Sequence, residues 1–329
     1  MAEAVNAGPA VLDVSGLSVA YAGDDGVPVA AVDRASLSIA EGQVHGLVGE
    51  SGSGKTSIAS AILGMLSPSA ALSGAIRFLD QDMLRLADRQ RRSIRGRLMS
   101  FIPQNPMSSL NPVLTVGYQI VETIRSHNDV GKPEARQRAI DALRQVGLPD
   151  PERALGRYPH EFSGGTAQRI LIAMALVNMP RLVIADEPTS ALDATVQRQI
   201  VELLAGLVRT RHMTMLLISH DLGTVASLSD RITVMYSGRI VESGSADAIL
   251  RWPRHPYTAA LVAAARGETA GVRRSDIDPR SLTTCRFLPR CPDAIDACRG
   301  PEPELVVVAD SHSARCRLAQ PSAAACESR

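Results

Sequence analysis

The sequence predicts an α/β fold in which helices cover a parallel sheet, and three observations support this prediction. A glycine-rich loop at residues 49–56 lies between an apolar, strand-like run and a helix-like run. Farther along, short apolar runs alternate with segments whose apolar residues have helical spacing. Hydrophobic residues make up 45% of the 329-residue chain, which is enough to bury the core of one large domain with an appendage or of two domains.

The composition limits the classes of function. The formal net charge is +1, so no overall field favours nucleic acid or an anionic membrane. No apolar run approaches the ~18 residues of a membrane span, and the N-terminal residues lack the pattern of a secretory signal. We therefore expect a cytosolic protein whose five cysteines are reduced, metal-bound or catalytic rather than paired in disulfides.

The elements before residue 80 predict antiparallel strands around the glycine-rich loop. Apolar positions alternate in residues 11–14, 17–21 and 35–39, as in half-buried strands. The helix after the loop is predicted to end near Gly64, and residues 73–79 predict a further strand.

Residues from about 85 to 165 are helix-forming and polar, which predicts an inserted helical subdomain. Its arginine-rich run at residues 89–97 fits a nucleic-acid patch or a solvated helix face, and the balanced net charge favours the solvated face. One helix is predicted over residues 133–146, and a long helix begins at Gly164 with Ser163 as its N-cap.

The following segment predicts the rest of the sheet. Residues 182–185 and 215–219 are apolar runs typical of strands buried on both faces, and a Ser237-Gly238 turn predicts a hairpin. After about residue 252 prolines and cysteines accumulate. The predicted domains are therefore residues 1–251 and a C-terminal extension at residues 252–329.

The glycine-rich loop reads G-x-x-x-x-G-K-[ST], which predicts a phosphate-binding loop in this strand–loop–helix context. The glycines let backbone N–H groups turn toward a phosphate, and the next helix points its positive end at the same group. Lys55 is expected to reach the β- and γ-phosphates and Thr56 to bind Mg²⁺. The expected contacts are Gly49, Ser51, Gly52, Ser53, Gly54, Lys55, Thr56 and Ser57.

Asp186 and Glu187 follow the apolar run at residues 182–185. The carboxyl ends of strands are where ligands bind in open α/β sheets. Asp186 is expected to hold Mg²⁺ together with Thr56, and a carboxylate engaged by a cation is a poor base. Glu187 is then the candidate that orients water against the γ-phosphate. The alternative, two solvated acids at a strand end, is disfavoured by the phosphate-binding loop.

Further motifs resemble those of the ABC-transporter ATPases. Residues 162–169 are similar to the signature motif of that family and residues 190–193 to its D-loop. Gln104 resembles its Q-loop glutamine, His220 its switch histidine and Tyr21 the aromatic residue that stacks on adenine. The six motifs stand in the family's order. They imply an ABC-type P-loop NTPase with a RecA-like core, an antiparallel β subdomain and an inserted helical subdomain.

The resemblance also implies ATP hydrolysis between two chains. The residues implied to contact ATP held by another subunit are Ser163, Gly164, Gly165 and Asp193. The implied catalytic residues are Glu187, His220 and Gln104. Taken by itself, His220 would be interpreted as a capped histidine at a strand end. Thr166 stands where many members have Gln, a variable position among peptide-importer ATPases, so we still expect a competent site.

Residues 103–112, 158–161, 193–197 and 255–258 are similar to the oligopeptide, dipeptide and nickel importer ATPases. The resemblance implies a peripheral subunit on the cytoplasmic face of the membrane that powers import of di- or oligopeptides. A nickel, metallophore or other solute importer is the alternative, followed by a soluble ABC ATPase or a regulatory nucleotide-binding module. The implied partners are a second ATPase subunit (a paralogue or a second copy), two permease subunits and, indirectly, an extracytoplasmic solute-binding protein, with no nucleic acid.

Cys285, Cys291, Cys298 and Cys316 lie within a stretch of 32 residues. Four thiolates on a strand-poor segment suggest an S₄ metal site with iron–sulfur or zinc, although close C-x₂-C pairs are absent. The segment resembles the C-terminal extension of oligopeptide and dipeptide importer ATPases, for which a 4Fe-4S cluster is implied. Zinc and unligated thiols remain alternatives, and Cys326 is expected to be a free surface thiol.

Overall fold

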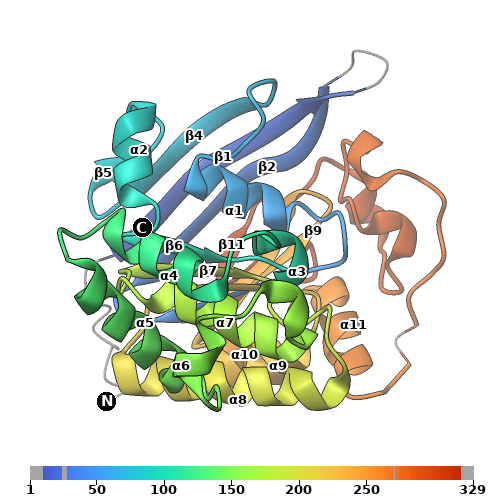
Figure 1. Ribbon diagram of the computed structural model, residues 1–329. Helices are drawn as coiled ribbons and strands as arrows, with labels where there is room; N and C mark the ends of the chain where they lie inside the picture. The colour runs from blue at the N-terminus through green and yellow to red at the C-terminus, as the bar shows by residue number, and fades with distance from the viewer. Residues whose placement is uncertain (1–9, 24–27, 270, 320–329) are drawn as a thin grey trace, which may run out of the picture. The chain divides into compact units, whose positions relative to one another are not determined.

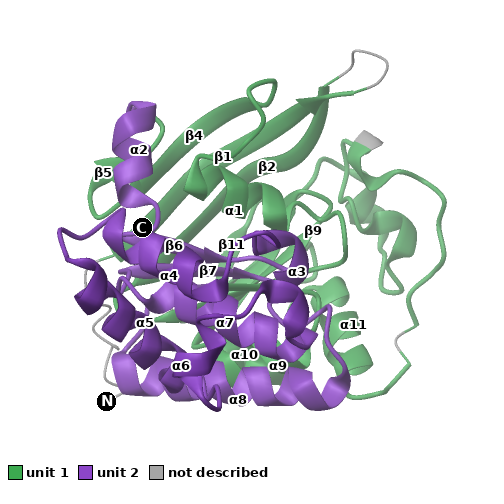
Figure 2. Cartoon of the chain, viewed as in Figure 1, with its two compact units in different colours: residues 1–84, 217–329 green, residues 85–216 purple. Residues whose placement is uncertain are grey.

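The computed structural model describes residues 10–23, 28–269 and 271–319. The chain divides into two compact units (Figures 1 and 2). Unit 1 comprises residues 1–84 and 217–329, and unit 2 comprises residues 85–216. The domain boundary expected between residues 251 and 252 stays a prediction.

Unit 1 begins with the antiparallel sheet that the alternating apolar positions predict, and Figure 1 shows its long strands in blue. The two runs expected as separate strands at residues 11–14 and 17–21 form one strand, because a bulge at Gly16 (φ 58°) restores the inward alternation. The strand order is β2-β1-β4-β5. The bounds are β1 (Ala10–Ala22), β2 (Pro28–Ala40), β4 (Ala71–Phe78) and β5 (Gln81–Asp82).

The second sheet of unit 1 carries the glycine-rich loop. Its strand β3 (Val44–Val48) is completely buried and pairs in parallel with β9 (Arg231–Tyr236). The predicted hairpin at Ser237-Gly238 is confirmed and leads into β10 (Arg239–Ser245). The helices of unit 1 are α1 (Lys55–Leu63), α9 (Leu222–Leu228), α10 (Ala246–Arg251) and α11 (Pro256–Ala265).

The C-terminal extension adds strands to this second sheet, which the sequence did not indicate. Strand β12 (His312–Ala314) pairs antiparallel with β10, and β11 (Val306–Ala309) pairs with β12. Short 3₁₀ turns complete the extension: η2 (Pro279–Ser281), η3 (Leu288–Arg290) and η4 (Asp296–Arg299).

Unit 2 combines a parallel strand pair with the predicted helical segment. Strands β6 (Met99–Ile102) and β7 (Leu182–Asp186) pair in parallel, and β8 (Met215–Ser219) spans the division between the units. The helices are α2 (Asp88–Ile94), α3 (Pro106–Ser109), α4 (Val116–Arg125), α5 (Lys132–Gln145), α6 (Pro151–Ala154), η1 (Pro159–Glu161), α7 (Gly164–Leu176) and α8 (Ala194–Arg211). Within the described parts of the chain, no helix is long and apolar enough to cross a membrane.

Candidate nucleotide-binding and catalytic sites

The phosphate-binding loop connects β3 to α1 in unit 1. Its last glycine, Gly54, has a φ of 103°, and a Cβ there would lie 2.3 Å from the carbonyl oxygen of Ala31. A Cβ on Gly49 would lie 2.2 Å from the carbonyl oxygen of Met235. The loop therefore needs glycine at these two positions, because the backbone of neighbouring segments lies directly against it.

The side chain of Lys55 is buried inside this loop. Its Nζ donates hydrogen bonds to the carbonyl oxygens of Gly49 at 2.8 Å and Glu50 at 2.9 Å. No acidic residue lies in the first turn of α1, so the positive end of the helix dipole stays uncompensated there. The lysine and the helix terminus together make this loop suited to bind a phosphate anion.

The other predicted ATP contacts of unit 1 lie on elements that flank the loop. The hydroxyl of Tyr21, at the end of β1, donates to Ser57 Oγ at 3.3 Å and so joins the predicted adenine-stacking ring to the first turn of α1. Ser53 is buried, whereas Thr56 is exposed. His220 is exposed directly after β8.

In unit 2 the structure brings two predicted catalytic residues together. Gln104 Nε2 donates to Glu187 Oε2 at 3.1 Å. Glu187 has a φ of 47°, a left-handed conformation that costs free energy for a non-glycine residue. The Ser190 hydroxyl donates to the Glu187 carbonyl oxygen and helps to hold this conformation. Asp186, the last residue of β7, is buried immediately before it.

The predicted trans-acting residues occupy two helix N-termini of unit 2. Ser163 Oγ accepts from the backbone N–H of Thr166, as predicted for the N-cap of α7, and lies 2.9 Å from the Thr166 hydroxyl. A Cβ on Gly165 would lie 2.5 Å from Val196, so α7 and α8 approach closely. Asp193 caps α8 by accepting from two backbone N–H groups.

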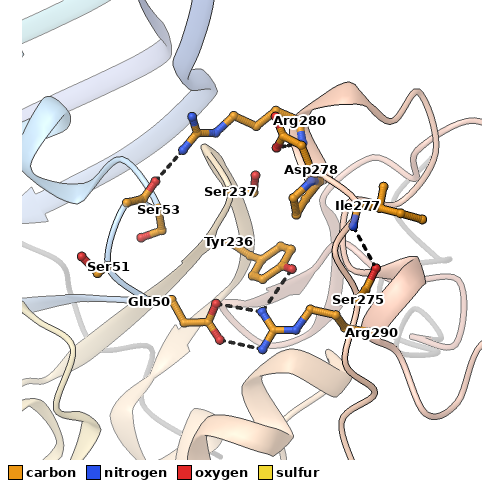
Figure 3. A pocket seen from close by; sticks show the side chains of 12 residues that line it. Glu50, Ser51, Ser53, Tyr236, Ser237, Ser275, Ile277, Asp278, Arg280 and Arg290 are labelled. Carbon is orange, nitrogen blue, oxygen red and sulfur yellow. Dashed lines mark hydrogen bonds and ion pairs between the residues drawn. The ribbon is translucent and has the colours of Figure 1, made fainter.

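The C-terminal extension contacts the phosphate-binding loop, a feature that the sequence did not reveal (Figure 3). Arg290 forms two hydrogen bonds with the Glu50 carboxylate, at 2.8 and 2.9 Å, and these bonds raise its pKa further above the usual value. Arg280 donates to the Gly52 carbonyl oxygen at 2.9 Å, and the Tyr257 hydroxyl accepts from the Glu50 backbone N–H at 2.8 Å. Between these contacts lies a cavity of about 260 Å³.

The four predicted metal-ligating cysteines line one small cavity of about 20 Å³, the room of about one water molecule. Burial raises the pKa of Cys285 to about 11 and also raises the pKa values of Cys291 and Cys316. Across the described residues, no group of three or more His, Cys, Asp or Glu side chains is arranged to hold a metal ion.

The expectation of an iron–sulfur or zinc centre at Cys285, Cys291, Cys298 and Cys316 is therefore not confirmed. The four thiols line one cavity, whose volume is about 20 Å³. Cys326 lies outside the described residues.

Comparison with known proteins shows the class of protein to which this chain belongs. Residues 32–190 match the family described as "ABC transporter". A solved dimeric structure of the ATP-binding cassette MJ0796, bound to ADP and Pi, is similar with a TM-score of 0.64 and 26% identity, covering 71% of this chain and 98% of that one. The cbiO1 protein of Clostridium perfringens, described as part of the ABC transporter complex cbiONQ, has a TM-score of 0.61 and 26% identity, covering 78% of this chain and 97% of that one. The chain is an ATPase of the ABC type.

Proteins with similar sequences show to which family of ABC-type ATPases the chain belongs. Residues 241–298 match the family described as "Oligopeptide/dipeptide transporter, C-terminal region". The dipeptide transport ATP-binding protein DppD of Escherichia coli (strain K12) is 46% identical, over 93% of this chain and 96% of that protein. The DppD of Bacillus subtilis (strain 168) is 42% identical over 94% of each chain. The chain belongs to this family of ABC-transporter ATP-binding proteins.

Proposed function

We propose that this chain is the subunit that hydrolyses ATP to power ABC import of di- or oligopeptides, acting peripherally on the cytoplasmic face of the membrane. The observation that carries the proposal is the presence, in one chain, of a full set of candidate ATPase residues and the C-terminal region of oligopeptide and dipeptide transporters. We also retain the expected division into an ATPase domain at residues 1–251 and an extension at residues 252–329.

In the proposed mechanism, unit 1 binds ATP. Lys55 and the N-terminus of α1 attract the β- and γ-phosphates, and Tyr21 supports the adenine. Thr56 and Asp186 offer the hard oxygen donors that suit Mg²⁺, which when bound neutralises charge on the phosphates. The exposed Thr56 and the carboxylate at the end of β7 fit this role.

Hydrolysis uses Glu187 and Gln104 of unit 2 and His220 of unit 1. Glu187, held by Gln104, accepts a hydrogen bond from the attacking water and orients it, and His220 of unit 1 helps to position the γ-phosphate. The capped N-terminus of α7 is a second anion-binding site in the same chain. A second such site in one chain has a role if the α7 N-terminus contacts ATP bound to a second ATPase subunit, either a paralogue or another copy. The further partners would be two permease subunits and, indirectly, a solute-binding protein.

Transport in proteoliposomes that contain the permease pair tests this proposal. We expect ATP-dependent uptake of a labelled dipeptide, and no uptake when the chain carries Lys55→Ala. Uptake of nickel instead of dipeptide would identify the alternative importer. A rate of ATP hydrolysis that changes neither with the permease nor with any solute would favour a soluble ABC ATPase and contradict the proposal.

We further propose that the four cysteines form a 4Fe-4S site, with zinc as the alternative. Their convergence on one cavity supports a shared ligand, but binding requires the thiols to lose their protons and move apart around it. Anaerobic purification followed by iron, sulfide and zinc analysis tests this. Absorption near ~400 nm with iron and sulfide supports a cluster, stoichiometric zinc supports the alternative, and absence of both metals refutes a metal site.

A further inference from the structure

Glu50 makes one hydrogen bond with Lys55 and connects the phosphate-binding loop to the C-terminal extension through Tyr257 and Arg290. Its carbonyl oxygen accepts a hydrogen bond from Lys55 Nζ, and its backbone N–H donates to the Tyr257 hydroxyl. Its carboxylate forms the two hydrogen bonds with Arg290 that Figure 3 shows. The peptide that helps to orient the candidate phosphate-binding lysine is therefore held from residues far along the chain.

The Glu50 carboxylate poses an electrostatic problem for an ATP site. A negative charge in the loop that receives the phosphates repels them, and this repulsion weakens nucleotide binding. Arg290 places its guanidinium on both carboxylate oxygens, a bidentate geometry that compensates the charge and fixes the side chain. The Arg290 guanidinium also lies 5.7 Å from the centre of the Tyr236 ring, which limits its movement.

A second arginine of the extension supports the same loop. Arg280 Nη2 donates to the carbonyl oxygen of Gly52, two residues after Glu50. On the other side, the Gly238 backbone N–H donates to the carbonyl oxygen of Ser53. The carbonyl oxygens of Gly52 and Ser53 are thus held by hydrogen bonds, which helps to fix the conformation of the loop.

We propose that Arg290 is a positioning residue of the ATP site, which neutralises Glu50 and holds the peptide that orients Lys55. The inference rests on the proposed ATPase function and adds to it that the C-terminal extension sets the affinity for ATP. Arg290 acts through Glu50 and does not itself contact the nucleotide.

A double-mutant cycle with measured ATP affinity tests the proposal. For the full chain, we expect Arg290→Ala to raise the Kd for ATP about tenfold, as fits loss of a bidentate charge-assisted pair, with kcat at saturating ATP changed less than twofold. In the Glu50→Gln background the same substitution should cost less than threefold, because no carboxylate is left uncompensated. Arg290→Lys keeps the charge but loses the bidentate geometry, so its Kd should lie between those of the wild type and Arg290→Ala.

The controls separate this inference from a purely structural contact. Arg299→Ala removes an arginine of the same extension whose side chain is 81% exposed, and it should leave the Kd unchanged. Thermal unfolding verifies that each variant is folded, and Arg290→Lys replaces Arg290→Ala if the latter is not. A Kd unchanged in both Arg290 variants, or a full tenfold loss that persists with Glu50→Gln, overturns the inference. Failure of the wild-type chain to bind or hydrolyse ATP would instead overturn the proposed function.

Discussion

In unit 1 the candidate phosphate-binding lysine is buried and donates hydrogen bonds to main-chain carbonyl groups, whereas in unit 2 the candidate catalytic glutamate is half-buried next to an exposed glutamine. Lys55 lies inside a loop whose glycines are fixed by neighbouring backbone. Glu187 receives a hydrogen bond from the exposed Gln104 and has a strained, left-handed backbone conformation. Side chains on the surface reorient more readily than a packed backbone. The first site is therefore preorganised, and the second is adjustable.

This difference predicts that binding and hydrolysis separate under mutation. Substitutions in the loop of unit 1 should alter nucleotide affinity, because they change the groups that hold the phosphates. Substitution of Glu187, directly after β7 in unit 2, should alter the rate of hydrolysis at saturating ATP, because it changes how water is oriented.

Glu187→Gln is the strongest test of this separation and has the largest expected effect. The amide cannot accept the proton of the attacking water, so we expect kcat for ATP hydrolysis to fall at least about a hundredfold. The Kd for ATP should stay within about threefold of the wild-type value, because binding energy used only in the transition state is lost. Steady-state hydrolysis and equilibrium ATP binding measure the two quantities.

Lys55→Ala is the matched control in unit 1. It removes the ammonium that attracts the phosphates, so the Kd for ATP should rise strongly, in contrast to Glu187→Gln. Hydrolysis by Glu187→Gln at more than a tenth of the wild-type rate would show that Glu187 is not the catalytic carboxylate and that the assignment of roles to the two units is wrong.

The same comparison shows what the sequence could predict. The phosphate-binding loop, the Ser163 N-cap and the Ser237-Gly238 hairpin follow from local rules about glycine, capping and turns, and each lies where the sequence indicated. The left-handed Glu187 and its bond to Gln104 are not local, since 83 residues separate the two side chains. No spacing rule could give that geometry.

The extension shows the limits of sequence reasoning more clearly. Pairing of β12 with β10 joins residues about 70 positions apart, and Arg290 reaches a glutamate 240 residues earlier. The arginines around the first two cysteines are visible in the sequence, but their partners depend on how the whole of unit 1 packs. The sequence shows four thiols that could serve as metal ligands. Their arrangement around one cavity, and the raised pKa of Cys285, depend on how the extension is buried.

The stability of unit 1 at acid pH gives a further prediction, whose expected effect is smaller than those of the Glu187 and Lys55 substitutions. Two histidines of unit 1 are buried: His45 lies on β3 with its Nε2 2.8 Å from Thr233 Oγ1, and His255 Nδ1 accepts a hydrogen bond from the Tyr257 backbone N–H. The pKa of each histidine is lowered to about 4, and burial is the main cause. The charge of Arg231 contributes to the lowering of the His45 pKa, whereas Glu242 partly opposes the lowering of the His255 pKa. The folded state thus favours the neutral rings, and protonating His255 would remove the acceptor that caps α11.

Because these pKa values lie below the unfolded value of about 6.5, the stabilisation is complete above that pH and is lost as the pH falls toward 4. Between pH 7 and pH 5 each histidine should reduce the free energy of unfolding by about 2 kcal/mol. Urea unfolding at the two pH values measures this, with His45→Gln and His255→Asn expected to show a smaller drop. His160→Gln, at an exposed position of unit 2, should keep the full wild-type drop. An equal drop in all four proteins would show that groups other than His45 and His255 cause the acid sensitivity.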